Sequence, residues 1–461
     1  MPRRLTDTET LLWNLEQNPN LASTMAAIVV LDAAPDPDRV RATAAKAVVA
    51  LAELRERVFE APLPLGTPHW GLDRTFDLDA HVRFVRLAHP ASQAALLELA
   101  TQLIADPFDR TRPLWSWTII TGLPRGRAAL VSKFHHSIAD GQGALKLAEH
   151  MLEFGEDAPP PPTVDLAGFL TELREVTDEQ QGTRSSGIRG GAERLLGLLG
   201  QAAGAVDPLR AVTAGQDAAA AARSLATQIT QPSVSPLWTA RSRNRRSRFL
   251  SLPLAEVKRA AADHGHSIND LFVTACARGV VAYHSVSGVE LPLVSATVVV
   301  STRREGDPDA HNAVIPTAIS LPGGPSDVDV QLLAVRDQIA QRRQHLSGSQ
   351  GILGPLTGLA GLIPGPLASA AAMEQTAKVD ISTSNLPGPP IPLWFAGRAI
   401  LELLPLGPVA GTASNITMLS YNDTAFIGLH IDPVAITDPD EFVRCVARGW
   451  VDLGVRRPKI R

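Results

Sequence analysis

A run of prolines divides this chain into two patterned parts. Residues 159–162 are four consecutive prolines, and the residues that follow, up to about Arg248, are rich in Ala, Gly and Gln and poor in aromatic side chains. That composition is typical of a linker with little packed core. The chain has 461 residues, which is more than a single hydrophobic core usually serves. We therefore predict two domains, 1–158 and 249–461, joined by a linker or crossover region at 159–248.

Both parts alternate between strand and helix patterns. Apolar and β-branched residues with a period of two predict strands, and a period near 3.6 predicts helices. In the first part we expect strands at 24–31, 82–87, 115–121 and 128–134 and helices at 38–54, 90–104 and 141–154. In the second part we expect strands at 293–301, 381–384, 415–421 and 425–431 and helices at 254–264, 268–284, 328–345 and 439–453. This order predicts an α/β fold class, in which α and β elements are mixed in both parts.

The composition argues against several classes of protein. With 43 basic and 47 acidic residues the net charge is −4, so the strongly basic face of a nucleic-acid-binding protein is not expected. The two cysteines, Cys276 and Cys445, are far apart in the sequence, which argues against a disulfide framework and favours a reducing compartment. Residues 1–9 lack the apolar stretch of a signal peptide, and no unbroken apolar run is long enough to span a membrane. We therefore expect a cytoplasmic protein.

The segment with the most chemical information is His135 to Gly141, which reads His-His-Ser-Ile-Ala-Asp-Gly. It joins a predicted strand to a predicted helix. Side chains alternate between the faces of a strand, so only one of His135 and His136 can face a given reaction centre. Asp140 precedes the helix, where an N-terminal carboxylate is favourable, and Gly141 permits a sharp turn. A histidine in a dry site is suited to act as a general base near neutral pH.

The histidine pair alone leaves several interpretations open. An incidental pair in the core is commoner than a catalytic pair, because short motifs match by chance. A metal site would need a third ligand at a suitable spacing, and His150 lies too far along the helix to supply one. Ser137 is a poor candidate for a nucleophile, because the chain contains no Gly-x-Ser-x-Gly turn. These residues by themselves do not decide whether the motif is catalytic.

The motif His-His-x-x-x-Asp-Gly resembles the active-site signature of the chloramphenicol-acetyltransferase-like superfamily. Other segments resemble those of one branch, the bacterial wax ester synthase/diacylglycerol acyltransferases, and they occur in order over almost the whole chain. They are Pro68-His69-Trp70 with residues 76–82, residues 107–109 with 112–115, Asn269 to Ala275, Ser384 to Pro389, and Asn415 to Tyr421. The sequence departs from the family pattern at residues 21–26, at Val299 in place of a proline and at His311 in place of a glycine.

This resemblance implies two chloramphenicol-acetyltransferase-like domains around a central tunnel. It implies an O-acyltransferase that takes a fatty acyl group from acyl-CoA as a co-substrate, with no bound cofactor and no metal. The acceptor would be diacylglycerol, which gives triacylglycerol, or a long-chain fatty alcohol, which gives a wax ester. Two alternatives stay open, namely a condensation-type enzyme with a carrier-protein-bound acyl donor and a non-catalytic lipid-droplet-associated protein. The intact motif argues against the second of these.

The resemblance also implies roles for individual residues. His136 would be the general base, and His135 would support it. Asp140 would be structural, and we expect Arg303 as its partner. Asn269 would reach the tunnel from the second domain and contact the oxyanion or the acceptor, or it could only cap its helix. Further substrate contacts are expected at Gly141, Ser384 and Asn385.

Two further segments could contact lipid or phosphate. Residues 352–372 are apolar but broken by Gly and Pro, and they could line an acyl pocket or rest on a lipid droplet, although burial in the core is the simpler interpretation. Five arginines between Arg241 and Arg248 could meet the phosphates of CoA or an anionic lipid surface, although a solvated linker end is the simpler interpretation. The resemblance thus leaves room for peripheral contact with the inner membrane or with lipid droplets.

Overall fold

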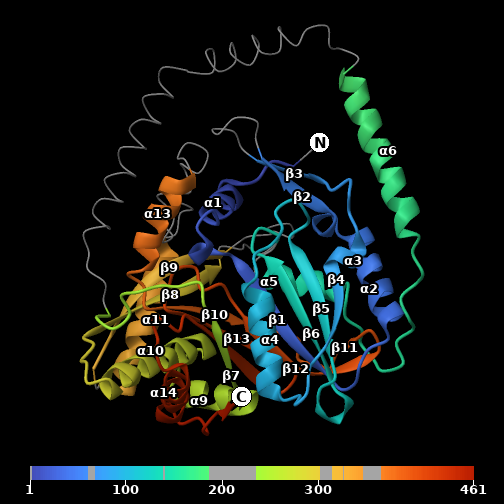
Figure 1. Cartoon of the computed structure of the whole chain (residues 1–461). Coiled ribbons are helices and arrows are strands. Elements are labelled where there is room, and N and C mark those ends of the chain that lie inside the picture. The colour runs from blue at the N-terminus through green and yellow to red at the C-terminus, as the bar shows by residue number, and fades with distance from the viewer. Residues whose placement is uncertain are drawn as a thin grey trace, which may run out of the picture.

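Two large β-sheets organise the fold. The computed structural model describes residues 3–60, 68–138, 141–185, 235–301, 314–324, 326–345 and 365–461. Within these residues, one large sheet has six strands and the other seven, and a separate sheet has two. The large sheets lie next to each other with helices around them (Figure 1). Both parts of the chain therefore mix helices and strands, which confirms the predicted fold class.

The first sheet has the strand order β11-β12-β1-β6-β5-β4. Its neighbouring strands are antiparallel, except that β4 and β5 are parallel. Its strands are β1 Thr24–Leu31, β4 Val82–Arg86, β5 Trp115–Thr121, β6 Ala128–His135, β11 Trp394–Phe395 and β12 Arg398–Leu406. The two-stranded sheet pairs β2 Glu56–Phe59 with β3 His69–Leu72.

The helices of the first part begin at capping side chains that satisfy free backbone N–H groups. Thr6 and Glu9 form a capping box at the first helix, Asp36 caps the second, and Ser92 caps the fourth. The helix after the His-His motif ends at Glu149 instead of the predicted residue 154. The helices are α1 Asp7–Leu15, α2 Pro37–Ala50, α3 Leu78–His81, α4 Gln93–Ala105, α5 Gly141–Glu149 and α6 Leu166–Ser185.

The second sheet has the strand order β15-β7-β14-β13-β10-β8-β9, in which β10 runs parallel to both β13 and β8. Its strands are β7 Arg246–Pro253, β8 Leu293–Ser301, β9 Val314–Pro322, β10 Ile381–Leu386, β13 Ser414–Tyr421, β14 Thr424–Ile431 and β15 Lys459–Ile460. The helices are α9 Leu254–Asp263, α10 Ile268–Val286, α11 Val328–His345, α13 Gly365–Thr376 and α14 Pro439–Asp452. Among the helices described, none has the length and apolar composition that crossing a membrane requires.

The sheets do not follow the course of the chain strictly. Strand β12, from the second part, pairs with β1, and Ile28 lies opposite Leu404. A close backbone contact also joins the sheets, because a Cβ atom on Gly428 of β14 would lie 1.8 Å from the carbonyl oxygen of Pro405 in β12. Glycine is therefore required at this crossing. The segment predicted as a linker contains α6 and the start of β7, and residues 186–234 lie outside the described part of the chain.

The arginines at the end of the predicted linker are mostly structural. The Arg241 guanidinium donates to the carbonyl oxygens of Gly411 at 2.8 Å and Ala377 at 3.2 Å. Arg248 pairs with Asp440 at 2.6 Å. A solvated linker end is therefore the wrong interpretation for Arg241 and Arg248, which tie the segment to neighbouring loops and to α14, whereas Arg243 and Arg246 are exposed. Of the apolar run at 352–372, residues 352–364 lie outside the described residues, and the rest forms part of α13.

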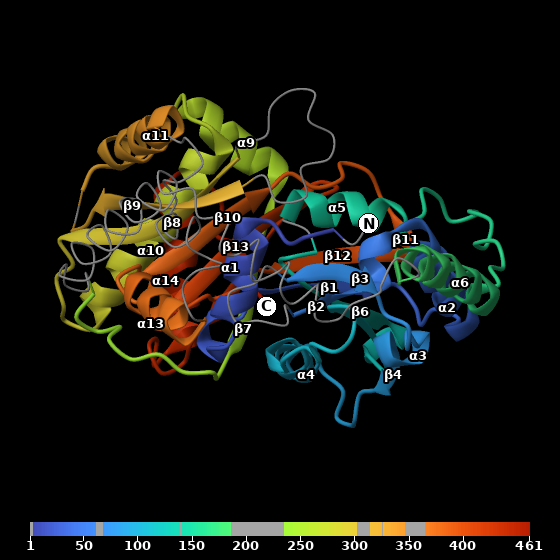
Figure 2. The ribbon, with the colours of Figure 1, turned by 90° about the horizontal axis from the view of Figure 1, so that it is seen from above.

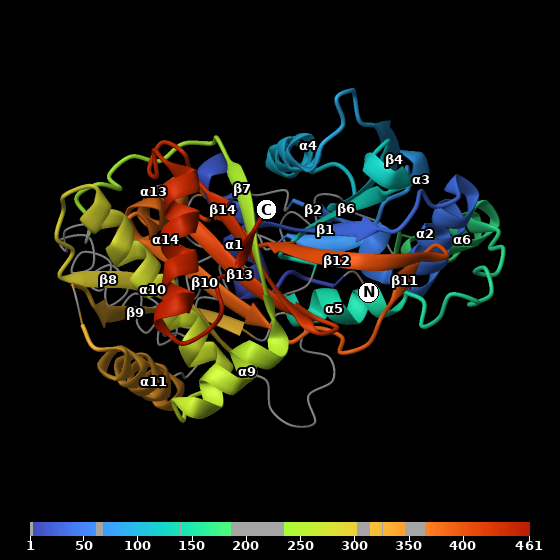
Figure 3. The ribbon, with the colours of Figure 1, turned by 90° about the horizontal axis from the view of Figure 1, so that it is seen from below.

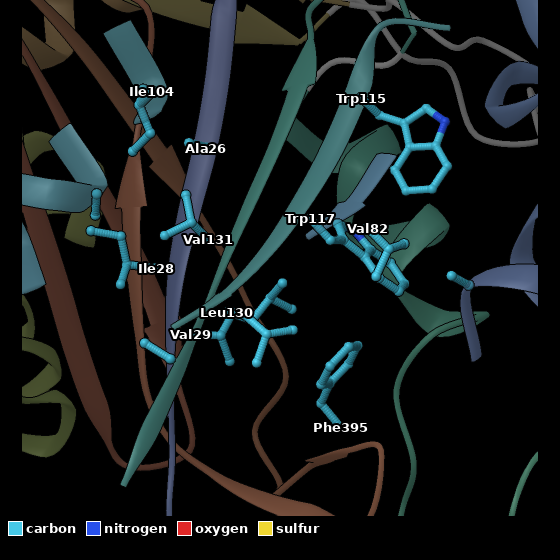
Figure 4. Close-up of a cluster of buried hydrophobic side chains, with 14 of the residues drawn as sticks. Ala26, Ile28, Val29, Val82, Ile104, Trp115, Trp117, Leu130, Val131 and Phe395 are labelled. Carbon is cyan, nitrogen blue, oxygen red and sulfur yellow. The ribbon is translucent and has the colours of Figure 1, made fainter. Parts of the chain in front are cut away.

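Each large sheet has its own hydrophobic core. In the first core, side chains from β1, β5 and β6 pack around the sheet (Figure 4). Trp117 of β5 meets Phe395 of β11 edge to face, with ring centroids 5.3 Å apart. The second core surrounds α10 and α14, where Phe272 and Trp450 are fully buried. Phe395 thus fixes a segment of the second part against the first sheet.

Candidate active site

The His-His motif stands where β6 leaves the first sheet. His135 pairs with Thr24 of β1, and the backbone N–H of His136 donates to the carbonyl oxygen of Ser23 at 2.9 Å. The His135 side chain is completely buried, whereas His136 is half-buried and lines a cavity. The two imidazoles therefore lie in different surroundings, as the alternation of side chains along a strand predicts.

A hydrogen-bond network fixes the ring of His135. Its Nδ1 atom accepts the backbone N–H of Ser137 at 3.0 Å and lies 2.6 Å from the Ser137 hydroxyl. An amide N–H can only donate, so Nδ1 carries no proton and the proton of the neutral ring is on Nε2. Nε2 lies 2.8 Å from Oε1 of Glu16 and donates to it. His135 therefore has both nitrogens engaged away from the cavity, which suits a supporting residue.

Glu16 connects this network to the start of β1. The residue caps the C-terminus of α1, and its Oε1 atom also accepts the backbone N–H of Ser23 at 2.5 Å. Burial alone raises the pKa of Glu16, but the interaction with His135, the Ser23 N–H and the charge of Arg110 outweigh it and lower the pKa below its ordinary value. An ionised Glu16 thus holds both His135 and Ser23, and the Ser23 carbonyl oxygen in turn accepts the backbone N–H of His136.

A cavity of about 1400 Å³ lies between the two sheets, and His136 is in its wall. Strands β1, β5 and β6 and helix α5 line it from the first part, and β8, β10, β13, α10 and α11 line it from the second. Most of the lining is apolar, for example Met25, Trp117, Leu147, Val298, Leu386 and Leu403. An apolar cavity with a few convergent polar groups is the usual form of a small-molecule site.

The cavity brings together residues that are far apart in the sequence. Asn269, Ser384 and Asn385 line it together with His136, as the predicted site requires. Gly141 is the first residue of α5. Asp140 and its predicted partner Arg303 lie outside the described residues, so their pairing stays a prediction. Within the described residues, no group of three or more His, Cys, Asp or Glu side chains is placed to hold a metal ion.

Asn269 does not cap its helix. The N-cap of α10 is Ser267, which forms a capping box with Asp270 through hydrogen bonds of 3.0 and 3.1 Å. The capping interpretation of Asn269 is therefore wrong. The half-buried Asn269 side chain lines the cavity in the first turn of a helix whose positive dipole end is directed toward the site.

A polar layer on the second sheet was not predicted as part of the site. Asn415 Nδ2 donates to the Ser382 hydroxyl at 2.8 Å, and Asn415 Oδ1 accepts from the Thr417 hydroxyl at 2.7 Å. All three residues line the cavity. The sequence did carry a signal for this layer, because every second residue of β13 lies on one face, namely Asn415, Thr417, Leu419 and Tyr421. Because these hydroxyl and amide groups bond to one another, they form a fixed polar surface opposite the first sheet.

Family models match most of the chain. A model described as the wax ester synthase/diacylglycerol acyltransferase catalytic domain matches residues 5–272, and one for the WS/DGAT C-terminal domain matches residues 312–452. A putative diacylglycerol O-acyltransferase of Mycobacterium tuberculosis is 28% identical over 450 residues, which are 96% of this chain and 90% of the relative. A probable diacylglycerol O-acyltransferase of that organism is 28% identical over 442 residues, covering 91% of this chain and 88% of the relative.

Solved structures share the fold. The wax ester synthase/diacylglycerol acyltransferase of Marinobacter aquaeolei superposes with a TM-score of 0.64 at 22% identity and covers 98% of both chains. The starter condensation domain of rhizomide synthetase superposes with a TM-score of 0.59 at 15% identity, covering 99% of this chain and 95% of that one. At such identities the likeness concerns the fold alone, and it agrees with the chloramphenicol-acetyltransferase-like architecture expected from the sequence.

Proposed function

This chain belongs to the wax ester synthase/diacylglycerol acyltransferase family and is an acyltransferase, and from that premise we propose the reaction that it catalyses. It transfers a fatty acyl group from acyl-CoA to the hydroxyl of diacylglycerol or of a long-chain alcohol. The products are triacylglycerol or a wax ester, and CoA. The observation that carries the proposal is an apolar cavity that is lined both by His136, at the end of β6, and by Asn269, in the first turn of α10.

His136 acts as the general base in this proposal. Its imidazole takes the proton of the acceptor hydroxyl while the alcohol oxygen attacks the thioester carbonyl. The tetrahedral intermediate then collapses, the carbon–sulfur bond breaks, and the imidazolium returns the proton to the thiolate of CoA. The proton taken from the acceptor hydroxyl leaves with the CoA thiol, and no electrons are transferred. The reaction as proposed therefore uses no cofactor and no metal. His135 supports the base through the network with Ser137 and Glu16.

Asn269 is the proposed partner of the developing oxyanion. An amide N–H₂ group that points into a dry cavity can donate to negative charge that forms only in the transition state. The half-buried side chain lines the cavity at the start of α10, where the helix dipole adds a favourable field. Ser384 and Asn385 line the same cavity from β10, and we assign them to substrate contact.

The acceptor lipid is proposed to enter from a lipid surface. Phe154 is 69% exposed and Ile391 is 46% exposed, yet both line the cavity, so they form an apolar lip at an opening. Backbone hydrogen bonds between Glu153 and Trp394, at 2.8 and 2.9 Å, hold the two segments together. Exposed apolar groups that continue into an apolar cavity favour peripheral contact with a membrane or a lipid droplet.

The Phe154→Asp variant tests this lip. It is expected to sediment less with phosphatidylcholine vesicles that contain diolein, because a carboxylate must stay in water. Val286→Asp is the matched control, since Val286 is 59% exposed but does not line the cavity. Equal vesicle binding by the two variants would mean that the lip does not contact the lipid surface.

A direct assay tests the reaction. Purified protein is incubated with labelled palmitoyl-CoA and either diolein or hexadecanol, and both free thiol and neutral lipid are measured. We expect thiol release and labelled product in equal amounts with at least one acceptor. Thiol release without neutral lipid would mean hydrolysis, and no reaction with either acceptor would contradict the assignment of a lipid alcohol. If the protein turned over only a carrier-protein thioester, the acyl donor would be that thioester and not acyl-CoA.

A further inference from the structure

One face of α11 carries two arginines to the cavity. The residues of this helix that line the cavity are Arg336, Ile339, Ala340 and Arg343. Their spacing of three, four and seven residues marks one side of an α-helix. The two arginines are two turns apart, about 10 Å along the axis. The cavity wall therefore carries an apolar centre with a guanidinium group at each end.

The position of this helix is fixed, but the two arginines that line the cavity make few contacts with the rest of the fold. Ile339 is 9% exposed and belongs to the second core, so it anchors the helix. The side chain of Arg336 is 52% exposed, and its ion pair is with the adjacent Asp337 at 3.4 Å. Arg343 is exposed and has no ion pair with another described residue. Apart from the exposed pair of Arg336 with its neighbour Asp337, no described side chain forms an ion pair with either guanidinium group, so both can turn to bind a ligand at the rim.

A neighbouring arginine shows what a structural role looks like. Arg278 of α10 pairs with Asp452 at 2.9 Å and donates to Gln331 and to the carbonyl oxygen of Ser326. That side chain is 20% exposed and joins three elements. Arg336 and Arg343 make no comparable set of contacts within the described chain, so packing does not explain why both point to the cavity.

The ligand that fits this rim is the phosphate-bearing end of the acyl donor. A fatty acyl chain belongs in the apolar interior, whereas the diphosphate and the 3′-phosphate of CoA must stay at an opening in contact with water. Guanidinium groups bind phosphate oxygens through two parallel hydrogen bonds. Helices α5 and α11 lie on the same side of the sheets in Figures 2 and 3, so α11 is on the side of the helix that follows His136.

We propose that Arg336 and Arg343 form a phosphate-binding rim that holds the nucleotide end of acyl-CoA and selects it over thioesters without those phosphates. This inference rests on the proposed acyl transfer and adds the donor-recognition residues. The rim also explains how one cavity can serve two substrates, because the donor is attracted to a basic opening and the acceptor to the apolar lip at Phe154 and Ile391.

Binding and turnover with two donors test the rim. CoA binding is measured by calorimetry and KM by thiol release, using palmitoyl-CoA and palmitoyl-pantetheine, for Arg336→Ala, Arg343→Ala and the double variant. A charge-assisted hydrogen bond is worth about tenfold in affinity. We expect each single variant to raise the Kd for CoA and the KM for palmitoyl-CoA about tenfold, with kcat and the KM for palmitoyl-pantetheine unchanged. The difference in Kd for CoA between the variants and the wild type should shrink in high salt, because the rim is exposed.

Arg342→Ala is the matched control. Arg342 lies on the same helix and is exposed, but it does not line the cavity. It should bind CoA like the wild type. If the double variant also binds CoA like the wild type, or if Arg342→Ala weakens binding as much, the rim is wrong. Calorimetry needs no turnover, so it tests the rim separately from the reaction. If the protein does not transfer acyl groups but the arginine variants still bind CoA more weakly than the wild type, the rim is supported and the proposed reaction is rejected.

Discussion

Replacing His136 with alanine is expected to lower kcat for acyl transfer by about a hundredfold to ten-thousandfold, the usual worth of a general base. The variant cannot take the proton of the acceptor hydroxyl, and His135 cannot replace the lost imidazole, because its own nitrogens bind Ser137 and Glu16. The half-buried position of His136 in the cavity wall means that alanine leaves space there instead of a clash. The measurement is single-turnover release of CoA thiol from palmitoyl-CoA in the presence of diolein.

His150→Ala is the control for the loss of a histidine near this site. His150 follows α5 directly, is exposed and does not line the cavity, so its removal should leave kcat unchanged. The KM of His136→Ala for palmitoyl-CoA should stay close to that of the wild type, because a base acts in the transition state and not in donor binding. A His136→Ala protein with wild-type kcat would reject the assignment of the base. Equal thermal unfolding midpoints of the two variants would show that the loss does not come from misfolding.

The local elements could be predicted because each carries its own periodicity. Strand β8 and helix α11 have the bounds expected from the sequence at 293–301 and 328–345. Strand β9 was not predicted, since Pro316 and Pro322 interrupt its pattern. Strand β12 was also missed, and even a correct strand assignment would not have revealed that it pairs with β1, because periodicity does not identify the partner of a strand.

In the site, too, the features set by neighbouring residues could be predicted, whereas contacts between distant segments could not. The alternation along β6 predicts that only one histidine of the pair can face the substrate, and the resemblance selects His136. The structure places His136 in the cavity wall and His135 in the interior. Glu16 could not be predicted, since it belongs to a helix that was itself missed and only folding brings it to His135. The roles of Asp140 and Arg303 rest on the resemblance alone.

Replacing Glu16 with alanine is expected to lower the free energy of unfolding by about 2–6 kcal/mol, which is a large share of the stability of a typical protein. The carboxylate accepts from Nε2 of His135 at 2.8 Å and from the backbone N–H of Ser23 at 2.5 Å. Without it, two buried donors lack an acceptor, and each costs about 1–3 kcal/mol. Activity should fall as well, because Ser23 and His135 hold the backbone and the motif around His136. Urea unfolding and kcat for palmitoyl-CoA are the two measurements.

Glu16→Gln separates the charge of Glu16 from its geometry. Both hydrogen bonds end on Oε1, and the glutamine carbonyl can accept both, so this variant should keep most of the stability and activity that Glu16→Ala loses. If Glu16→Gln loses as much activity as Glu16→Ala, the negative charge and not the position of the oxygen is what the motif requires. If neither variant loses activity, Glu16 does not position the motif.

The pH dependence of stability gives an independent check on the charge. Because the folded protein lowers the pKa of Glu16 from 4.5, the ionised group stabilises the fold above pH 4.5, and this contribution is lost as the pH falls through the lowered value. Glutamine does not titrate in this range, so the stability difference between the wild type and Glu16→Gln should be constant near pH 7 and change in favour of the variant below about pH 4.5. A difference that stays constant into the acid range would mean that folding does not shift the titration of Glu16. The network would then act through hydrogen-bond geometry alone.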